Sequence, residues 1–377
     1  MAFIHFSPLG KNSPILIHTS NSLTRQVWQE LTTLRFENRR KIILAPKAIA
    51  PWVDQAKMYF LDATQSNWRS AGLLYYYSFL NLAKAYLVAK RTVSYKTLDT
   101  TSIYHGLQAG LQPLNYITDF EITIFPPTYQ GRKNIFSMLY ETIFAKQWPF
   151  DNPISVSLAD IVGHCVDVSI ELETLFNIKN RIIRTQSLIR FENNETWFEM
   201  AVEKANPEIV IQQIENMQLD IVKLDELTST SRNDWRRALN VTAEILPQMI
   251  FLRGPKKSIN QNDDKDLNLK ATALALETTI NFEVHSIPHV AVDTINKTWL
   301  FIPNVSISGK SFLWHPVLSD YLFAFALSSI LRYQPQFLDP TSRNYLFSEA
   351  WCSQSALSTA RYFLMLFTEP PIAIKTY

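Results

Sequence analysis

The stretch WRSAGLLYYYSFLNLAKAYLVAK, residues 68–90, decides the fold. It is long, contains no proline and repeats apolar residues at helical spacing, so it predicts an α-helix. Leu73, Tyr76 and Leu80 lie on one apolar stripe of that helix. Leu74 falls outside the stripe, so apolar side chains cover most sides. The pattern predicts a largely buried helix at the centre of a helical bundle.

Further helical segments flank this helix. Apolar residues recur three and four positions apart on both sides of it, which is the spacing of one helix face. Ser157 is of the residue type that caps a helix N-terminus, and Asp160 follows three residues later. The predicted helices cover residues 23–40, 52–63, 101–111, 133–146, 157–176, 315–333 and 353–367.

The middle of the chain has a different pattern. Residues 181–191 and 195–202 have strand character and flank Asn193–Asn194, which predicts a β-hairpin. Further strands are predicted at 120–125, 280–292 and 298–307, a helix at 206–217 and a polar surface loop at 254–268.

The predicted fold class is α+β and mostly helical, with a strand-containing section inserted into a helical bundle. Residues 1–180 form the mainly helical bundle in this interpretation, and residues 181–310 form a mixed α+β section. The helices of residues 311–377 are expected to pack back on the bundle.

The composition excludes several classes of protein. Hydrophobic residues make up 47% and charged residues 19% of the 377 residues, as in a globular protein. The net charge of +2 gives no electrostatic case for nucleic-acid binding. No apolar stretch is long enough to span a membrane. The sequence shows no secretion signal, and its two cysteines cannot form a disulfide framework, so we expect a cytosolic protein.

The common catalytic and cofactor motifs are absent. The sequence contains no GxxxxGK[ST], GxGxxG, HExxH, CxxC or GxSxG. His285 and His289 are close in sequence, but Pro288 and the strand-like context do not suit a helical pair of metal ligands. We therefore predict neither a cofactor nor a metal.

Three segments resemble the YaaC-like family of bacterial proteins. They are residues 68–90, the short YHGL at 104–107 and WHPVLSDYLFAFALSSILRYQP at 314–335. The paired tyrosines followed by Asn-x-x-Lys-Ala also resemble the core helix of HEPN-type helical bundles. The resemblance implies a bacterial, cytosolic protein with a HEPN-like helical bundle, and the YaaC-like family has no settled activity.

The HEPN resemblance can be tested on a motif. HEPN ribonucleases carry an arginine followed four to six residues later by a histidine, a pair that acts on the RNA 2′-hydroxyl and phosphate. The arginine nearest before His105 is Arg91, fourteen residues back, and no other histidine fits the spacing. A standard HEPN nuclease is therefore not favoured.

Five residues are the candidate ligand contacts. Asn81 and Lys84 share a face of the central helix, and a lysine on a buried helix either pairs with an anion or extends its ammonium to the surface. Tyr77 offers a stacking face or packs in the core. His105, beside Gly106, is a candidate ligand contact or a turn residue, and Arg332 either binds an anion or bonds the last carbonyls of its helix.

These residues lead to one principal hypothesis and two alternatives. The principal one is a non-catalytic cytosolic protein that binds a small anionic ligand or a protein partner through Asn81, Lys84, His105, Arg332 and Tyr77. The first alternative is a HEPN-related nuclease or toxin-type effector of bacterial defence, which convergence of His105 and Arg332 with Lys84 in one open cleft would favour. The second is a structural subunit with a covered aromatic surface. A homo-oligomer is an open alternative, nucleic acid is not favoured, and no membrane partner is expected.

Overall fold

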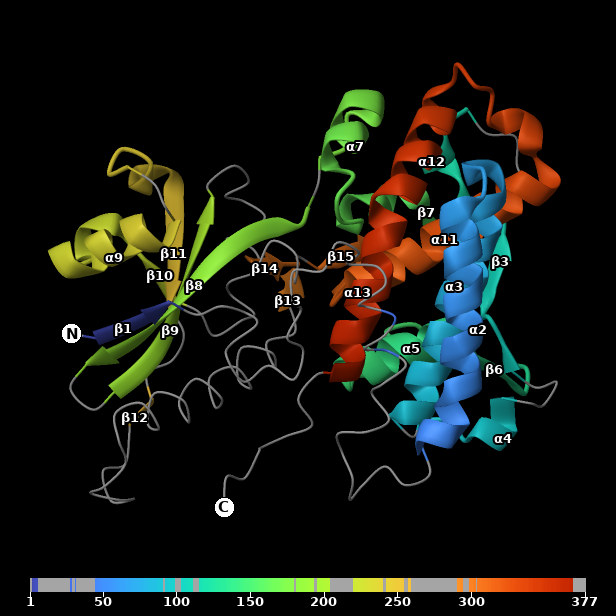
Figure 1. Ribbon diagram of the computed structural model, residues 1–377, viewed down its shortest axis with the longest axis horizontal. Helices are drawn as coiled ribbons and strands as arrows, with labels where there is room; N and C mark the ends of the chain where they lie inside the picture. The colour runs from blue at the N-terminus through green and yellow to red at the C-terminus, as the bar shows by residue number, and fades with distance from the viewer. Residues whose placement is uncertain are drawn as a thin grey trace. The chain divides into compact units, whose positions relative to one another are not determined.

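The computed structural model describes most of the chain. Its contacts define two compact units (Figure 1). Ile17–Asn180 and Asn304–Glu369 form one, which we call the helical unit. Met1–Leu16, Arg181–Pro303 and Pro370–Tyr377 form the other, the sheet unit. The described residues are 2–5, 28, 31, 45–90, 92–98, 103–110, 115–179, 181–192, 195–203, 220–239, 242–253, 257–258, 290–293, 298–302 and 304–368.

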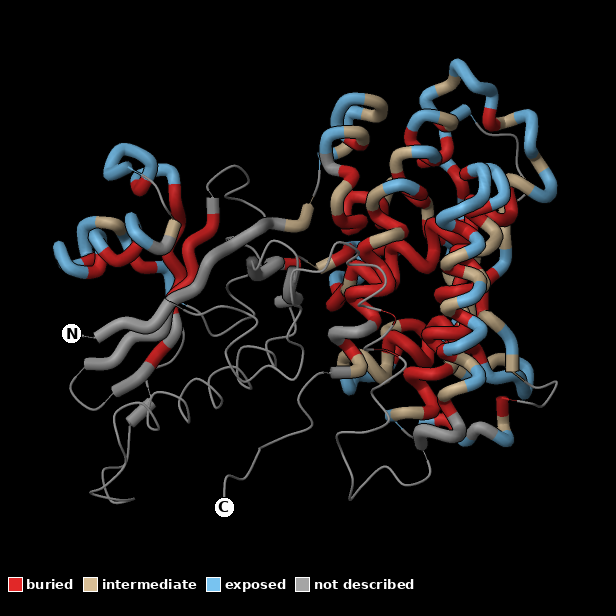
Figure 2. The backbone as a smooth tube through the Cα atoms, in the orientation of Figure 1, coloured by how far each residue is buried: buried red, intermediate tan, exposed pale blue. Residues whose placement is uncertain are grey.

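The centre of the helical unit is α3 (Trp68–Ala89), which packs against α2 (Ala45–Gln65) and α11 (Pro316–Tyr333). This confirms the predicted central helix. At Gly72, α3 and α11 approach closely: a Cβ there would lie 2.7 Å from Leu327 Cγ. Figure 2 shows α11 buried along most of its length. Two apolar helices in direct contact thus form the core of this unit.

Local sequence explains where the two central helices begin. The Asn67 side chain accepts a hydrogen bond from the Arg69 backbone N–H, which caps α3. At the start of α11, His315 Nδ1 accepts from the Val317 N–H, and Pro316 occupies the first helical position. Both helices begin within a residue or two of the predicted positions.

The predicted helix at 101–111 is wrong. The segment forms two short strands, β2 (Ile103–Tyr104) and β3 (Leu107–Ala109), on either side of Gly106. Gly106 has φ +80°, and a Cβ there would lie 2.6 Å from Asn134 Cβ. A left-handed residue with a neighbour that close stops a helix and turns the chain. The turn places His105 between two small sheets.

These two sheets have three strands each. In one, β2 runs parallel to β6 (Arg132–Asn134), which pairs with β5 (Thr128–Tyr129). In the other, β4 (Glu121–Ile124) lies between β3 and β7 (Ile154–Ser157), antiparallel to both. Strand β4 confirms the prediction at 120–125.

The single helix predicted at 157–176 is also wrong. The segment contains α6 (Leu158–Ile161), the 3-10 turn η2 (Val162–His164) and α7 (Ser169–Phe176). Ser157 does cap α6, accepting from the Ala159 N–H, as predicted. Asp167 has φ +66°, a conformation that interrupts a helix, so the apolar periodicity runs across a break.

The remaining elements complete the helical unit. The predicted helix at 353–367 is confirmed as α13, whereas α12 was not predicted. Helix α5 confirms the prediction at 133–146. The elements are α4 (Tyr95–Leu98), η1 (Ile117–Asp119), α5 (Ile135–Phe144), β15 (Val305–Ile307), β16 (Lys310–Phe312), η5 (Pro335–Phe337), α12 (Arg343–Ser353) and α13 (Ser355–Thr368).

The sheet unit is built on an antiparallel sheet. The predicted hairpin is confirmed: β8 pairs with β9, with Glu192 opposite Glu195 beside the turn. The strand order is β10-β11-β9-β8-β14-β13, with β1 also on β8 and β12 on β9. The strands are β1 (Ala2–His5), β8 (Ile183–Glu192), β9 (Glu195–Glu203), β10 (Asp220–Val222), β11 (Met249–Arg253), β12 (Lys257–Ser258), β13 (Val290–Asp293) and β14 (Thr298–Phe301).

Some predictions lie wholly or partly outside the described residues. The helix at 206–217 is one, and most of the helix at 23–40 and of the loop at 254–268 are others. Strand β13 covers the end of the strand predicted at 280–292, and β14 and β15 lie within that predicted at 298–307.

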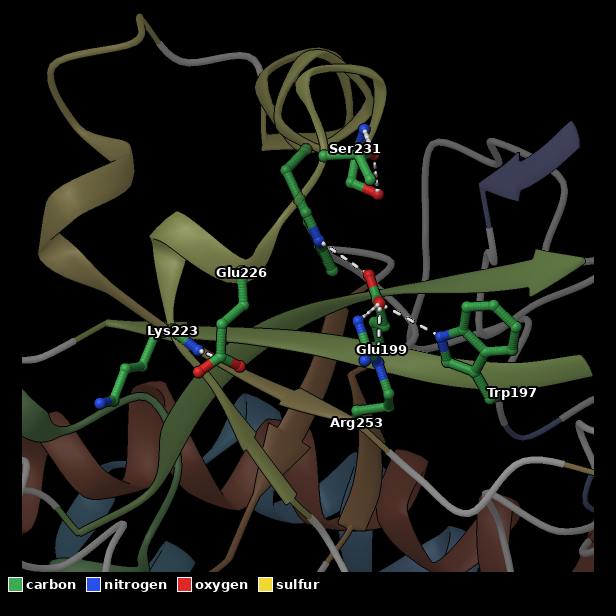
Figure 3. Close-up of polar contacts among 8 residues, drawn as sticks. Trp197, Glu199, Lys223, Glu226, Ser231 and Arg253 are labelled. Carbon is green, nitrogen blue, oxygen red and sulfur yellow. Dashed lines mark hydrogen bonds and ion pairs between the residues drawn. The ribbon is translucent and has the colours of Figure 1, made fainter. Parts of the chain in front are cut away.

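A buried carboxylate lies at the centre of the sheet unit (Figure 3). Glu199 on β9 stands opposite Arg253 on β11, and Arg253 Nη2 lies 3.0 Å from Glu199 Oε1. The indole N–H groups of Trp197 and Trp235 donate to the same carboxylate, at 3.1 and 3.2 Å. Trp235 belongs to α9 (Ser229–Leu239), which therefore bonds to the sheet. Two 3-10 turns, η3 (Leu224–Glu226) and η4 (Leu246–Gln248), complete this region.

The observed architecture is mixed α+β, as predicted at that level. Searching the described helices reveals none with the length and apolar character needed to cross a membrane.

Candidate functional site

The candidate site lies within the helical unit and draws on three elements. Helix α3 carries Tyr77, Asn81 and Lys84, and the turn between β2 and β3 carries His105. Arg332 lies in the last turn of α11. Because α11 packs on α3, residues from distant parts of the sequence reach the same region.

His105 is held in place by its backbone and its ring. Its carbonyl accepts a hydrogen bond from the Phe136 N–H, and its Nδ1 accepts from the Leu107 N–H at 3.1 Å. The ring lies 5.4 Å from Phe325 and 6.4 Å from Tyr76, centroid to centroid. Since Nδ1 is an acceptor, the neutral ring carries its proton on Nε2.

Burial and positive charge lower the pKa of His105. Desolvation is the larger cause, and the charges of Arg332 and Lys84 add to it. Of the described residues, these two cations, one from α11 and one from α3, are the charged groups that lower this pKa. Burial and the two charges therefore favour the neutral form of His105.

Arg332 makes a hydrogen bond within its own helix, and its guanidinium forms no ion pair with a described residue. Its Nε donates to the Ser328 carbonyl at 3.0 Å, which confirms the predicted contact with the end of its own helix. The guanidinium carbon lies 5.2 Å from the centre of the Tyr333 ring. In the part of the chain that the structure describes, no carboxylate lies within ion-pair distance of Arg332. Its terminal nitrogens can therefore meet an external anion.

Lys84 lies on the opposite helix of this region. It is half-buried, and its Nζ lies 4.5 Å above the centre of the Trp52 ring on α2. Lys84 also acts electrostatically on His105. Arg332 and Lys84 thus both act electrostatically on His105.

The other two predicted residues stand apart from this group. Tyr77 is half-buried, with its ring 5.5 Å from Tyr76 and 5.4 Å from Tyr59. It borders the group through Tyr76. Asn81 is buried on α3, and no contact between described residues joins it to His105.

From the sequence, Tyr76 is either a stacking face, like Tyr77, or a core residue; in the structure it is buried and its ring lies 6.4 Å from that of His105. Burial raises the pKa of its phenol, and the charge of Arg332 opposes that rise. The hydroxyls of Tyr76 and Tyr321 influence each other, but neither has a hydrogen-bond partner of good geometry within the described ranges.

A second buried polar cluster lies around Asp320 on α11. Its carboxylate accepts from Trp351 Nε1 at 3.0 Å, Ser355 Oγ at 2.7 Å and Thr359 Oγ1 at 2.8 Å. Desolvation raises the pKa of Asp320 to about 7, against the effect of these hydrogen bonds. Its partners come from α12 and α13, so the cluster joins three helices of the core.

Metal ligands do not gather in the described part of the chain. Among those residues, no three His, Cys, Asp or Glu side chains are placed to hold a metal ion. The group around His105 instead consists of donors: an ammonium, a guanidinium, an imidazole N–H and a buried phenol. A set of donors with two positive charges suits an anion.

Comparison with protein families gives a match over most of the chain. A family described as YaaC-like protein matches residues 16–368. The chain belongs to the YaaC-like family. Comparisons with curated proteins and with solved structures find no significant match. In this YaaC-like protein, the three segments that resemble the family lie in α3, in the turn between β2 and β3, and in α11. Those elements carry Lys84, His105 and Arg332.

Proposed function

We propose that this YaaC-like protein is a cytosolic binding protein that takes up a small anionic ligand beside Lys84, His105 and Arg332. The HEPN-like helical bundle expected from the sequence would serve as a scaffold rather than as a nuclease. Tyr77 borders the ligand, and Asn81 supports α3 from within the core.

The main support is the charge environment of His105. A half-buried histidine lies under the influence of two cations from different helices, and no carboxylate in the described part of the chain contributes to the shift of its pKa. Low-dielectric surroundings strengthen the attraction between such cations and an anion. An anion would also relieve the repulsion that both cations exert on a protonated His105.

Each residue has a chemical role in the proposed complex. Arg332 presents the planar edge of its guanidinium, which matches the oxygens of phosphate or carboxylate. Lys84 supplies a point charge fixed over Trp52. His105 donates a neutral hydrogen bond from Nε2, because Leu107 holds its Nδ1.

Isothermal titration with inorganic phosphate tests this proposal. We expect saturable binding to the full chain and a loss of at least tenfold in affinity in Lys84→Met and in Arg332→Met. Lys90→Met is the matched control, because Lys90 directly follows α3 and also lies over a ring, that of Tyr86, at 5.4 Å. Equal affinity in all three variants, or no binding to the wild type, would contradict the proposal.

The alternative is an enzyme, and the electrostatic action of Arg332 and Lys84 on His105 is the observation that favours it. A neutral imidazole beside cations could accept a proton from a hydroxyl of an anionic substrate. An RNA-cleavage assay with the wild type and His105→Asn separates the two ideas. Cleavage that the variant loses would replace the binding hypothesis with the nuclease hypothesis.

A further inference from the structure

Helix α9 of the sheet unit has an exposed basic side, which we call the arginine face. Its exposed residues recur three or four positions apart, which places them on one side of the helix. They are Ser229, Arg232, Asn233, Arg236 and Arg237. The acid within α9, Asp234, is buried, at 3% exposed. The arginine face therefore presents three guanidinium groups and no carboxylate of its own helix.

The buried side of α9 fixes the helix on the sheet. Trp235 is 0% exposed, and its ring lies 5.5 Å from that of Phe251 on β11, centroid to centroid. Its indole N–H donates to Glu199 on β9. At the start of the helix, Thr228 Oγ1 accepts from the Ser231 N–H at 3.1 Å. Because these contacts hold the opposite side of α9, the arginine face is directed outwards.

The three arginines differ in how far they are already engaged. Arg232 donates from Nε to the Leu224 carbonyl at 3.1 Å and from Nη2 to the Asp225 carbonyl at 3.3 Å. Both acceptors are neutral, so Arg232 keeps its charge while its side chain is held in place. Arg236 and Arg237 are exposed, and with the described residues neither forms an ion pair or a side-chain hydrogen bond. Their guanidinium groups can therefore meet carboxylates of a partner.

The surroundings of the arginine face favour a short protein segment over a nucleic acid. The 11 residues of α9 span about 16 Å. Exposed Asp225 and Glu226 lie in η3 at one border of the helix, and exposed Glu244 precedes η4 at another. A phosphate backbone that ran beyond α9 would meet these carboxylates and be repelled. Ile245, 38% exposed at the start of η4, offers an apolar contact that a protein side chain can use.

We infer that the arginine face of α9 docks an acidic helix of a partner protein, which carries carboxylates one turn apart. Arg232 and Arg236 are four residues apart, about 6 Å along the helix, the same spacing as glutamates four residues apart on a partner helix. A guanidinium can donate two parallel hydrogen bonds to one carboxylate. This surface belongs to the sheet unit, so the inference is independent of anion binding beside His105.

Fluorescence anisotropy with labelled probes tests the inference on the full chain. The probes are a helical peptide with glutamates four residues apart, the same peptide with glutamine in place of glutamate, and an oligouridine of equal charge. We expect saturable binding of the glutamate peptide and at least tenfold weaker binding of the glutamine peptide and of oligouridine. Added salt should weaken the binding of the glutamate peptide, because exposed charges are screened.

Two double variants assign the binding to α9. Arg236→Gln with Arg237→Gln removes two charges from the arginine face and should weaken binding of the glutamate peptide at least tenfold. Glutamine is a good helix former, so α9 should remain folded, which hydrogen exchange in α9 checks. Lys133→Gln with Lys146→Gln is the matched control, because it removes the same charge from exposed positions of the helical unit. This control should leave binding unchanged.

Three outcomes would overturn the inference. One is the absence of saturable binding of the glutamate peptide to the wild type. Another is an equal loss in the two double variants, which would show that overall charge and not the arginine face determines binding. The third is oligouridine binding as tightly as the glutamate peptide and weakening in the arginine variant, which would make the arginine face a nucleic-acid contact.

Discussion

The sheet unit and the helical unit differ in the groups that surround their cations. In the sheet unit, Arg253 is paired with Glu199, and two indole N–H groups complete the carboxylate's bonds (Figure 3). In the helical unit, Arg332 and Lys84 act on His105, and no acid among the described residues contributes to the shift of its pKa. One cluster pairs its arginine with a carboxylate, whereas in the other two cations act on a histidine.

The difference distinguishes charged residues that stabilise the fold from charged residues that can bind a ligand. A buried carboxylate that lost its arginine would leave an uncompensated charge, so the Glu199 cluster contributes to stability. Arg332 is exposed, and its charge compensates nothing in the described part of the chain, so it can serve binding at little cost to the fold. Substitutions in the two regions should therefore have different effects.

The largest expected effect is in the sheet unit. Arg253→Met should lower the free energy of unfolding of this unit by about 3 kcal/mol, because Glu199 is 1% exposed and would lose its cation. Hydrogen exchange in β9 and β11 measures the change. Adding Glu199→Gln to the variant should restore much of the protection. An unchanged exchange rate in Arg253→Met would remove the contrast between the two regions.

The turn that carries His105 should be the next most sensitive position. Gly106→Ala combines φ +80° with a Cβ 2.6 Å from Asn134 Cβ, so we expect a loss of about 2 kcal/mol. Phosphate binding should weaken as well. Gly309→Ala is the matched control: Gly309 has φ +74° but no atom within 4 Å of the added carbon. Equal losses in urea unfolding would show that the close contact has no effect.

Asp320 is a buried acid whose hydrogen-bond partners are neutral, and it should make stability depend on pH. Its pKa of about 7 exceeds the ordinary value of 3.8, so between these values the folded state holds a proton that the unfolded state has lost. Stability therefore falls as pH rises through this window. Relative to Asp320→Asn, the wild type should lose about 1.5 kcal/mol between pH 5.5 and pH 7.

The asparagine at this position has a structural rationale. Its oxygen can accept from Trp351 and Ser355, and its amide can donate to Thr359, whose own hydroxyl also donates to the Ser355 carbonyl. Urea unfolding at the two pH values measures the difference. A wild type and variant with the same pH dependence would show that Asp320 is ionised throughout.

The smallest effect on stability is expected at Arg332. Arg332→Met should change the free energy of unfolding by less than about 0.5 kcal/mol, because the side chain is exposed and one helix-end hydrogen bond is lost. The same variant should weaken phosphate binding strongly. If it unfolds the helical unit as Arg253→Met unfolds the sheet unit, Arg332 has a structural role and the comparison fails.

The sequence predicted the strongly periodic elements of this fold and missed those that depend on single residues. Helices α3 and α11 follow from long apolar patterns, and the β8–β9 hairpin follows from its strand residues. The turn at Gly106 and the break at Asp167 depend on positive φ values, which periodicity does not reveal. Helix α12 was missed because its apolar residues are spread around the helix and form no clear stripe.

The candidate site was predicted in part for the same reason. Polar character in apolar or turn surroundings predicted three of the site residues, namely Lys84, His105 and Arg332. That Lys84 on α3 and Arg332 on α11 act on His105 in the β2–β3 turn is a property of tertiary packing. For Tyr76 the sequence left a stacking role and a core role open, and its position beside His105 depends on tertiary packing.

The most direct test of the account is the pKa of His105, measured by NMR titration of its ring protons in anion-free buffer and again with sulfate. Because burial and two cations act on the ring, we expect a pKa below 6.5 without sulfate. The pKa should rise when sulfate neutralises the cations, and also in Arg332→Met. A pKa at or above 6.5 in the absence of sulfate, or one that sulfate leaves unchanged, would contradict the anion site.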